Sequence, residues 1–211
     1  MAINRKYIIK ALLFPWKHSE LGENLRRGGS GFQGIFLLLG LGLLFSLTSF
    51  IQAATGNFPA VPIVLPITLE NYFFWQALLV MPWVVASYIL VVLVARLFLM
   101  LAGAESVNVR QLKAYLGLSF SFCLFWLWIP HLLTAVFYLL GMSQKEWVDL
   151  LSEPGWFQTL YIVIISLAVL GGGLALNLSL IKKKWTNKIA SILTASLSYL
   201  FWLALILILL R

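Results

Sequence analysis

Long apolar runs alternate with short polar stretches along almost the whole chain. Each run holds about 20 residues or more, which is enough for a helix to cross the hydrocarbon core of a bilayer. A helix is the expected conformation because it satisfies its backbone polar groups internally, and the alternation of β-barrel strands is not seen. We therefore predict an all-α fold, a polytopic transmembrane helical bundle with five membrane-spanning helices. The spans are expected at about 32–54, 72–101, 114–140, 157–181 and 189–210.

The same pattern predicts how the chain is organised. Residues 1–31 are polar-rich and predict a cytosolic or interfacial N-terminal segment, whereas residues 32–211 form the five-helix transmembrane domain. The first apolar run is longer than the about 7–15 residues of a signal-peptide core. Residues 58–69 are apolar but contain three prolines, so we expect an interfacial loop on the outer side rather than a span.

A short helix is expected between the third and fourth spans. Ser143 followed by Glu146 has the spacing of a capping box, which satisfies two of the first N–H groups of a helix. The helix should end before Pro154, since the residue before a proline avoids helical geometry. Its apolar positions, which include Trp147, predict that it rests on the outer membrane surface.

Composition supports the membrane class and excludes others. The chain is 62% hydrophobic and 10% charged, with a mean hydropathy of +0.96, whereas a soluble domain is about half apolar and about a quarter charged. The net charge of +8 does not indicate nucleic-acid binding, because the basic residues flank the apolar runs. One cysteine and two histidines are too few for a cysteine- or histidine-rich metal centre. We expect no nucleic-acid partner, no metal and no cofactor.

The basic residues predict the orientation. Thirteen of the fifteen lysines and arginines precede the first span, lie at the end of the second, or occupy the second-to-third and fourth-to-fifth connections. Cytoplasmic loops have such an excess, so we expect a cytoplasmic N-terminus and an outer C-terminus, in the inner (cell) membrane of a bacterium. Basic clusters also attract anionic headgroups, by about 1 kcal/mol per residue. The residues expected to contact anionic lipid are Arg26, Arg27, Lys182, Lys183 and Lys184.

The third span contains a histidine in an otherwise apolar run. Pro130 removes the helical hydrogen bond of the Trp126 carbonyl, so this point of the span needs polar partners. Three interpretations of His131 stay open: a neutral side chain bonded in the bundle core, a proton-handling or ligand-binding group in a polar cavity, and a residue in an outer vestibule. Thr134 lies on the same helical stripe as Pro130, which we expect to face other helices.

Two further polar residues complete the candidate intramembrane site. Arg96 lies near the inner end of the second span, where it either snorkels to the headgroups or holds an anionic lipid or substrate. Asn177 in the fourth span pairs with Gly173 at helical spacing. The candidate site is therefore Arg96, Pro130, His131, Thr134 and Asn177.

Small residues recur every four positions in the fourth span, at Gly171, Ala175 and Ser179. This pattern lets helix backbones approach closely and predicts helix packing. The alternative is that the three glycines at 171–173 form an unwound segment at a binding site, as in the discontinuous helices of some transporters.

The middle of the chain contains a long second span that ends near Arg96 and Gly103, a short polar loop leading through VRQLKAYLG, and a third span interrupted by Pro130. The segment is FFWQALLVMPWVVASYILVVLVARLFLMLAGAESVNVRQLKAYLGLSFSFCLFWLWIPHLL (73–133). It resembles the Yip (Ypt-interacting protein) domain family of five-span membrane proteins. The resemblance implies an all-helical integral membrane protein without catalytic residues. Eukaryotic members are associated with Rab-type GTPases and vesicle traffic, but the short N-terminal segment here is similar to that of prokaryotic members, so the GTPase link does not transfer.

These observations leave a choice of function. The first hypothesis is a non-enzymatic protein that organises, scaffolds or traffics membrane components through helix–helix contacts, with membrane lipids and either a membrane protein or a second copy as partners. The alternative is a small permease or lipid-handling protein with a polar site near His131. An intramembrane enzyme is disfavoured, because the sequence offers no paired carboxylates, serine–histidine arrangement or metal-ligand set, and we expect no catalytic residues.

Overall fold

The computed structural model describes residues 5–27, 33–57, 69–104 and 107–210. These residues are helical apart from short connections, and they form no strand. The predicted all-α bundle is confirmed, because five described helices are long and apolar enough to cross a membrane. They are α3 (Gln33–Ala54), α4 (Tyr72–Leu101), α5 (Val109–Leu139), α7 (Trp156–Lys183) and α8 (Lys188–Leu209).

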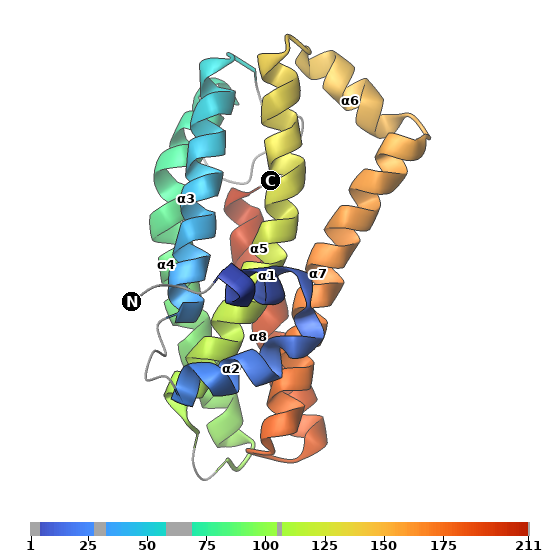
Figure 1. Ribbon diagram of the computed structural model, residues 1–211. Coiled ribbons are helices and arrows are strands. Elements are labelled where there is room, and N and C mark those ends of the chain that lie inside the picture. The colour runs from blue at the N-terminus through green and yellow to red at the C-terminus, as the bar shows by residue number, and fades with distance from the viewer. Residues whose placement is uncertain (1–4, 28–32, 58–68, 105–106, 211) are drawn as a thin grey trace.

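Helix α5 lies in the middle of the molecule, with α3 and α4 on one side and α7 on the other (Figure 1). It packs against each of them and also against the N-terminal helices. We call the end of the bundle where α6 (Gln144–Ser152) joins α5 to α7 the α6 end. The opposite end, where α7 connects to α8, is called the α7–α8 end.

Glycines allow the tightest helix crossing, between α3 and α5. A Cβ atom placed on Gly117 would lie 2.9 Å from the carbonyl carbon of Gly34, so the two backbones touch there. On the other side of α5, aromatic rings fill the core, where Phe120 stacks on Trp202 of α8 with ring centroids 4.0 Å apart. Cys123 is buried in the same core. Close packing of this kind replaces the hydrophobic driving force that is missing between helices in lipid.

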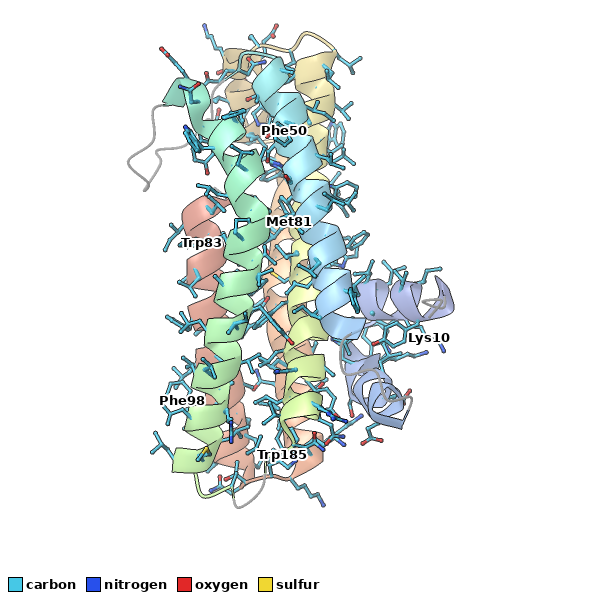
Figure 2. The ribbon with its side chains drawn as sticks, turned by 90° about the vertical axis from the view of Figure 1, so that its left-hand side faces the viewer. Lys10, Phe50, Met81, Trp83, Phe98 and Trp185 are labelled. Atoms are coloured by element: carbon cyan, nitrogen blue, oxygen red, sulfur yellow. The ribbon has the colours of Figure 1, made fainter. Side chains whose placement is uncertain are left out.

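Helix α8 stops inside the bundle. Figure 1 shows that it ends lower than α3 and α5 do at the α6 end. The last carbonyls of a helix lack N–H partners and must be satisfied by other groups in a membrane. Here the Leu209 carbonyl accepts hydrogen bonds from Tyr72 Oη and Gln76 Nε2, each at 2.8 Å. Trp83 of α4 also lies beside α8 (Figure 2), and its Nε1 donates to the Leu205 carbonyl at 2.7 Å.

One helix boundary differs from the prediction, and one predicted segment lies almost wholly outside the described residues. Helix α5 begins at Val109, not near residue 114, because the Asn108 side chain caps it by accepting a hydrogen bond from the Gln111 N–H at 3.1 Å. The expected interfacial loop at 58–69 lies almost wholly outside the described residues. Its last residue opens the short 3-10 turn η2 (Leu69–Asn71).

The connecting helix α6 is confirmed, but the predicted position of its Trp147 is wrong. It has the capping box of Ser143 and Glu146 and ends at Ser152, before the proline. Its Trp147 does not rest on the membrane surface, because only 3% of this residue is exposed. The indole ring packs instead against Phe137 and Phe157, with centroids within 6 Å. The free energy gained from these aromatic contacts exceeds that of placing the indole ring at the membrane interface. Helix α6 therefore covers one end of the bundle.

The N-terminal segment forms a compact unit on the side of the bundle. It consists of α1 (Arg5–Leu13), the 3-10 turn η1 (Pro15–Lys17) and α2 (His18–Arg27). Figure 2 shows the unit standing out beside the long helices, with Lys10 on it. It is attached by buried apolar residues such as Leu12 and Leu21, and by an ion pair of 2.7 Å between Glu23 and Lys183 of α7.

The burial of His18 predicts that the docking of this N-terminal unit onto the bundle depends on pH. Its Nε2 lies 2.7 Å from the Ala11 carbonyl, and its Nδ1 is buried without a partner among the described residues. Burial lowers the pKa of His18 from 6.5 to about 4. Between about pH 4 and pH 6.5 the docked form therefore binds fewer protons than the released form. Docking is strongest above pH 6.5 and weakens as the pH falls.

We expect amide hydrogen exchange in residues 18–27 to show this weakening. At about pH 5 the docking free energy should be lower than at neutral pH by up to about 2 kcal/mol, after correction for the intrinsic exchange rate. The variant His18→Gln, which cannot titrate, should remove the pH dependence. Equal protection of the wild-type segment at both pH values would show that His18 does not control docking.

Candidate functional site

A cavity of about 290 Å³ lies at the α6 end of the bundle. Six helices line it: α3, α4, α5, α6, α7 and α8. The space exists because α8 ends early, α7 leans away from α5 toward this end, and α6 bridges the two (Figure 1). Its volume is near the lower end of the range for small-molecule sites, about 300–1,000 Å³.

His131 lines the cavity and begins a chain of hydrogen bonds into the bundle. Its Nε2 lies 3.0 Å from Ser49 Oγ of α3, and this hydroxyl donates to Gln76 Oε1 of α4 at 2.9 Å. Gln76 Nε2 then donates to the Leu209 carbonyl of α8. One polar chain thus joins four spans, and the ring of His131 also lies against that of Phe45, with centroids 5.1 Å apart.

A second amide meets the backbone of His131. Gln52 Nε2 donates to the His131 carbonyl at 3.1 Å, beside the proline of α5. Gln52 is only 1% exposed, and its Oε1 has no hydrogen-bond partner among the described residues. A buried acceptor without a donor costs about 1–3 kcal/mol, so a bound molecule that donates to this oxygen would gain that free energy.

The predicted site residues fall into two groups. Pro130, His131 and Thr134 all line the cavity, where the Thr134 hydroxyl donates to the Pro130 carbonyl at 3.0 Å. Arg96 and Asn177 do not join them, because each lies near the α7–α8 end of its helix, far along the bundle from His131. Arg96 is exposed on α4.

Asn177 contributes to the contact between α7 and α8 instead. Its Nδ2 donates to the Gly173 carbonyl of its own helix at 2.9 Å and to Ser196 Oγ of α8 at 3.4 Å. Its Oδ1 is buried without a partner among the described residues, as Gln52 Oε1 is, but Asn177 does not line the cavity. The contact with Ser196 therefore indicates helix packing at this position.

The small residues of α7 lie in helix contacts. Gly171, Ala175 and Ser179 are all buried. A Cβ atom on Gly171 would overlap the ring of Phe122, so the glycine makes room for this side chain of α5. The alternative of an unwound glycine segment is wrong, because α7 continues as a helix from Trp156 to Lys183.

The basic cluster lies at the α7–α8 end. Lys182 and Lys184 are exposed, whereas Lys183 is paired with Glu23. Arg26 and Arg27 close helix α2. Contact of these residues with anionic lipid stays a prediction.

Sequence reasoning missed the polar partners of His131. Ser49, Gln52 and Gln76 were not singled out, nor was the end of α8 at Leu209. A signal was present, since Ser46, Ser49 and Gln52 recur every three residues in an apolar span, and polar side chains within a membrane face the bundle interior.

The contact between Ser49 and His131 is a serine–histidine pair that the sequence did not reveal. It lacks the features of a nucleophile and its base. Ser49 is fully buried, its hydroxyl donates to Gln76 rather than to the imidazole, and it does not line the cavity. Among the described residues, no aspartate or glutamate lines the cavity to orient the ring. The pair therefore positions His131 and does not itself provide acyl-transfer chemistry.

Comparisons with protein-family models, curated proteins and solved structures find no match to this chain. Its class is defined by the fold: a multi-pass, all-α membrane protein with five candidate spans among the described residues. What the cavity binds has to be inferred from its chemistry.

Proposed function

We propose that this protein binds a small molecule, or part of a lipid, in the cavity at the α6 end, and that it is a small permease or lipid-handling protein rather than an enzyme. The observation that supports this proposal is the cavity itself, which is lined by His131 and by Gln52, whose Oε1 is buried without a partner among the described residues. A buried polar group kept without a partner is costly in a stable core but useful in a site that a ligand completes.

The orientation belongs to the same proposal. The excess of basic residues supports a cytoplasmic N-terminus, so that the α6 end faces the outer side of a bacterial inner membrane. The acidic residues Glu146, Asp149 and Glu153, on and beside α6, would then face outward. A molecule would enter the cavity from that side or from the outer leaflet.

Native mass spectrometry of the protein, released from its own membranes under mild conditions, tests the proposal. We expect a defined extra mass on the wild-type protein that is reduced about tenfold or more in His131→Leu, because one hydrogen bond in a buried site contributes about 1–3 kcal/mol. Asn177→Leu is the matched control, a polar-to-leucine change at the other end of the bundle, and it should retain the mass. A wild-type protein without any bound molecule would contradict the proposal.

The second candidate function is the organisation of other membrane components through helix–helix and partner contacts. The five-span architecture, with a 30-residue second span, favours it because both features agree with the resemblance to the Yip domain family. The same spectra distinguish the two functions. A stoichiometric complex with another membrane protein, or a homo-oligomer without a small ligand, would support the organising role and identify the partner.

A further inference from the structure

We infer that the cavity takes an organic ammonium ion that has at least two N–H groups and an apolar body. The inference rests on the proposed ligand-binding function and names its ligand class. It comes from the juxtaposition of two hydrogen-bond acceptors, Gln52 Oε1 and His131 Nδ1, with the C-terminal end of α8 and a wall of aromatic rings around one cavity.

The hydrogen-bond chain determines which nitrogen of His131 accepts. Gln76 Nε2 donates to the Leu209 carbonyl, so Gln76 Oε1 faces Ser49 and takes the single proton of its hydroxyl. Ser49 Oγ can then only accept from His131, and Nε2 must be the protonated nitrogen of the neutral ring. Nδ1 is then the ring nitrogen without a proton, and it can accept a hydrogen bond.

Gln52 supplies the second acceptor. Because its Nε2 donates to the His131 carbonyl, the orientation of the amide is determined and Oε1 is the free atom. Gln52 is almost fully buried and lines the same cavity as His131. Two acceptors from neighbouring helices therefore require a ligand that donates hydrogen bonds, as a primary or secondary ammonium does.

The end of α8 adds a negative potential. Leu207 and Leu210, at the C-terminal end of this helix, line the cavity. The C-terminus of a helix has the equivalent of roughly half a negative charge, which favours a cation over an anion within the last turn. The described residues that line the cavity include no lysine, arginine, aspartate or glutamate, so the helix end and the two acceptors determine which sign of charge is favoured.

Aromatic rings form much of the remaining wall. Phe45, Phe73, Tyr138, Trp147 and Tyr161 all line the cavity. The faces of such rings attract ammonium groups, and they also accommodate an apolar body. The exposed residues on and beside α6 include Glu146, Asp149 and Glu153 but only one lysine, Lys145, so the approach to the cavity favours cations as well.

Other ligand classes interact favourably with only part of the cavity lining. A neutral alcohol has one proton, so it can donate to only one of the two acceptors, and it gains little from the helix end and the ring faces. A quaternary ammonium gains from the rings but cannot donate to His131 or Gln52. A carboxylate meets acceptors and a negative helix end, and is disfavoured by both.

The test is isothermal titration calorimetry of the full chain in nanodiscs of phosphatidylcholine, with empty nanodiscs titrated in parallel to subtract partition. Four probes share one phenyl body: 2-phenylethylammonium, 2-phenylethanol, trimethyl(2-phenylethyl)ammonium and 3-phenylpropanoate. We expect 2-phenylethylammonium to bind about tenfold or more tightly than the alcohol and the quaternary ion, and the carboxylate not to bind. Gln52→Met should lower the affinity for 2-phenylethylammonium about tenfold, and Asn177→Leu should leave it unchanged.

Several results would overturn the inference. These are equal or tighter binding of the alcohol, the quaternary ion or the carboxylate, an affinity unaffected by Gln52→Met, and no binding of any probe. The selectivity series uses the wild-type protein, so it does not depend on the folding of a variant. If native spectra show a bound molecule that His131→Leu removes while the ammonium is not preferred, the ligand class is wrong and the binding function stands. If neither a bound molecule nor probe binding is found, both are wrong.

Discussion

Replacing Gly117 with leucine is expected to lower the free energy of unfolding by about 3 kcal/mol, the largest effect of any single change considered for this fold. Even a Cβ atom at this position would lie 2.9 Å from the carbonyl carbon and 3.1 Å from the Cα of Gly34. The atoms in conflict belong to backbone, so no side-chain rotation relieves the overlap. Helices α3 and α5 must move apart, which weakens the contacts that hold Ser49 and Gln52 of α3 near His131.

The matched control for this change is Gly40→Leu. Gly40 is a glycine within helix α3, it is exposed, and a Cβ atom there meets nothing within 4 Å. Reversible unfolding in mixed micelles, followed by circular dichroism, would measure both variants. If the two substitutions have similar effects, the close crossing of α3 and α5 does not stabilise the bundle.

Replacing Gln76 with methionine, which has a similar length but no strong polar group, is expected to cost about 2 kcal/mol. The change leaves the Ser49 hydroxyl without its acceptor and the Leu209 carbonyl with Tyr72 as its remaining donor. It also frees the Ser49 proton, which can then be donated to His131 Nε2. The tautomer of His131 would change, and Nδ1 would no longer be an acceptor. We therefore expect Gln76→Met to weaken ligand binding as well as stability.

Gln158→Met is the control for this second prediction. Gln158 lies near the start of α7 and makes a hydrogen bond of 3.5 Å to the Ser152 carbonyl, which is too long to contribute much. Its replacement should change the free energy of unfolding by less than about 0.5 kcal/mol. An equally small effect of Gln76→Met would mean that water or another donor satisfies the end of α8.

The spans could be predicted from the sequence because their signals are local. Bilayer thickness sets a minimum length for each apolar run, and the five runs agree with α3, α4, α5, α7 and α8 to within a few residues at most ends. The capping box of Ser143 and Glu146 is also local, since both hydrogen bonds form within three residues. Helix α5 begins before the apolar run that predicts it, because the polar residues before residue 114 are helical from their cap at Asn108.

The site could be predicted only in part, because its geometry depends on how the helices pack sideways. Pro130 and His131 marked a polar point in one span, but the partners of His131 come from α3, α4 and α8. The position of Trp147 depends on aromatic residues of α5 and α7, which the connection joins. The pattern of α6 alone does not include them and therefore suggests the membrane surface. Counting residues along antiparallel spans places Arg96 and Asn177 near the end of the bundle opposite to His131. The sequence alone is therefore sufficient to exclude these two residues from the site around His131.

Cys123 gives the chain a practical property. It is the only cysteine in the sequence and lies fully buried in the core. A membrane-impermeant thiol reagent should therefore leave the folded wild-type protein unlabelled and report only cysteines introduced by design. Lys145 and Lys184 are exposed at opposite ends of the bundle, so a cysteine at each of them would read out the sidedness of the protein in intact cells without removal of the native thiol.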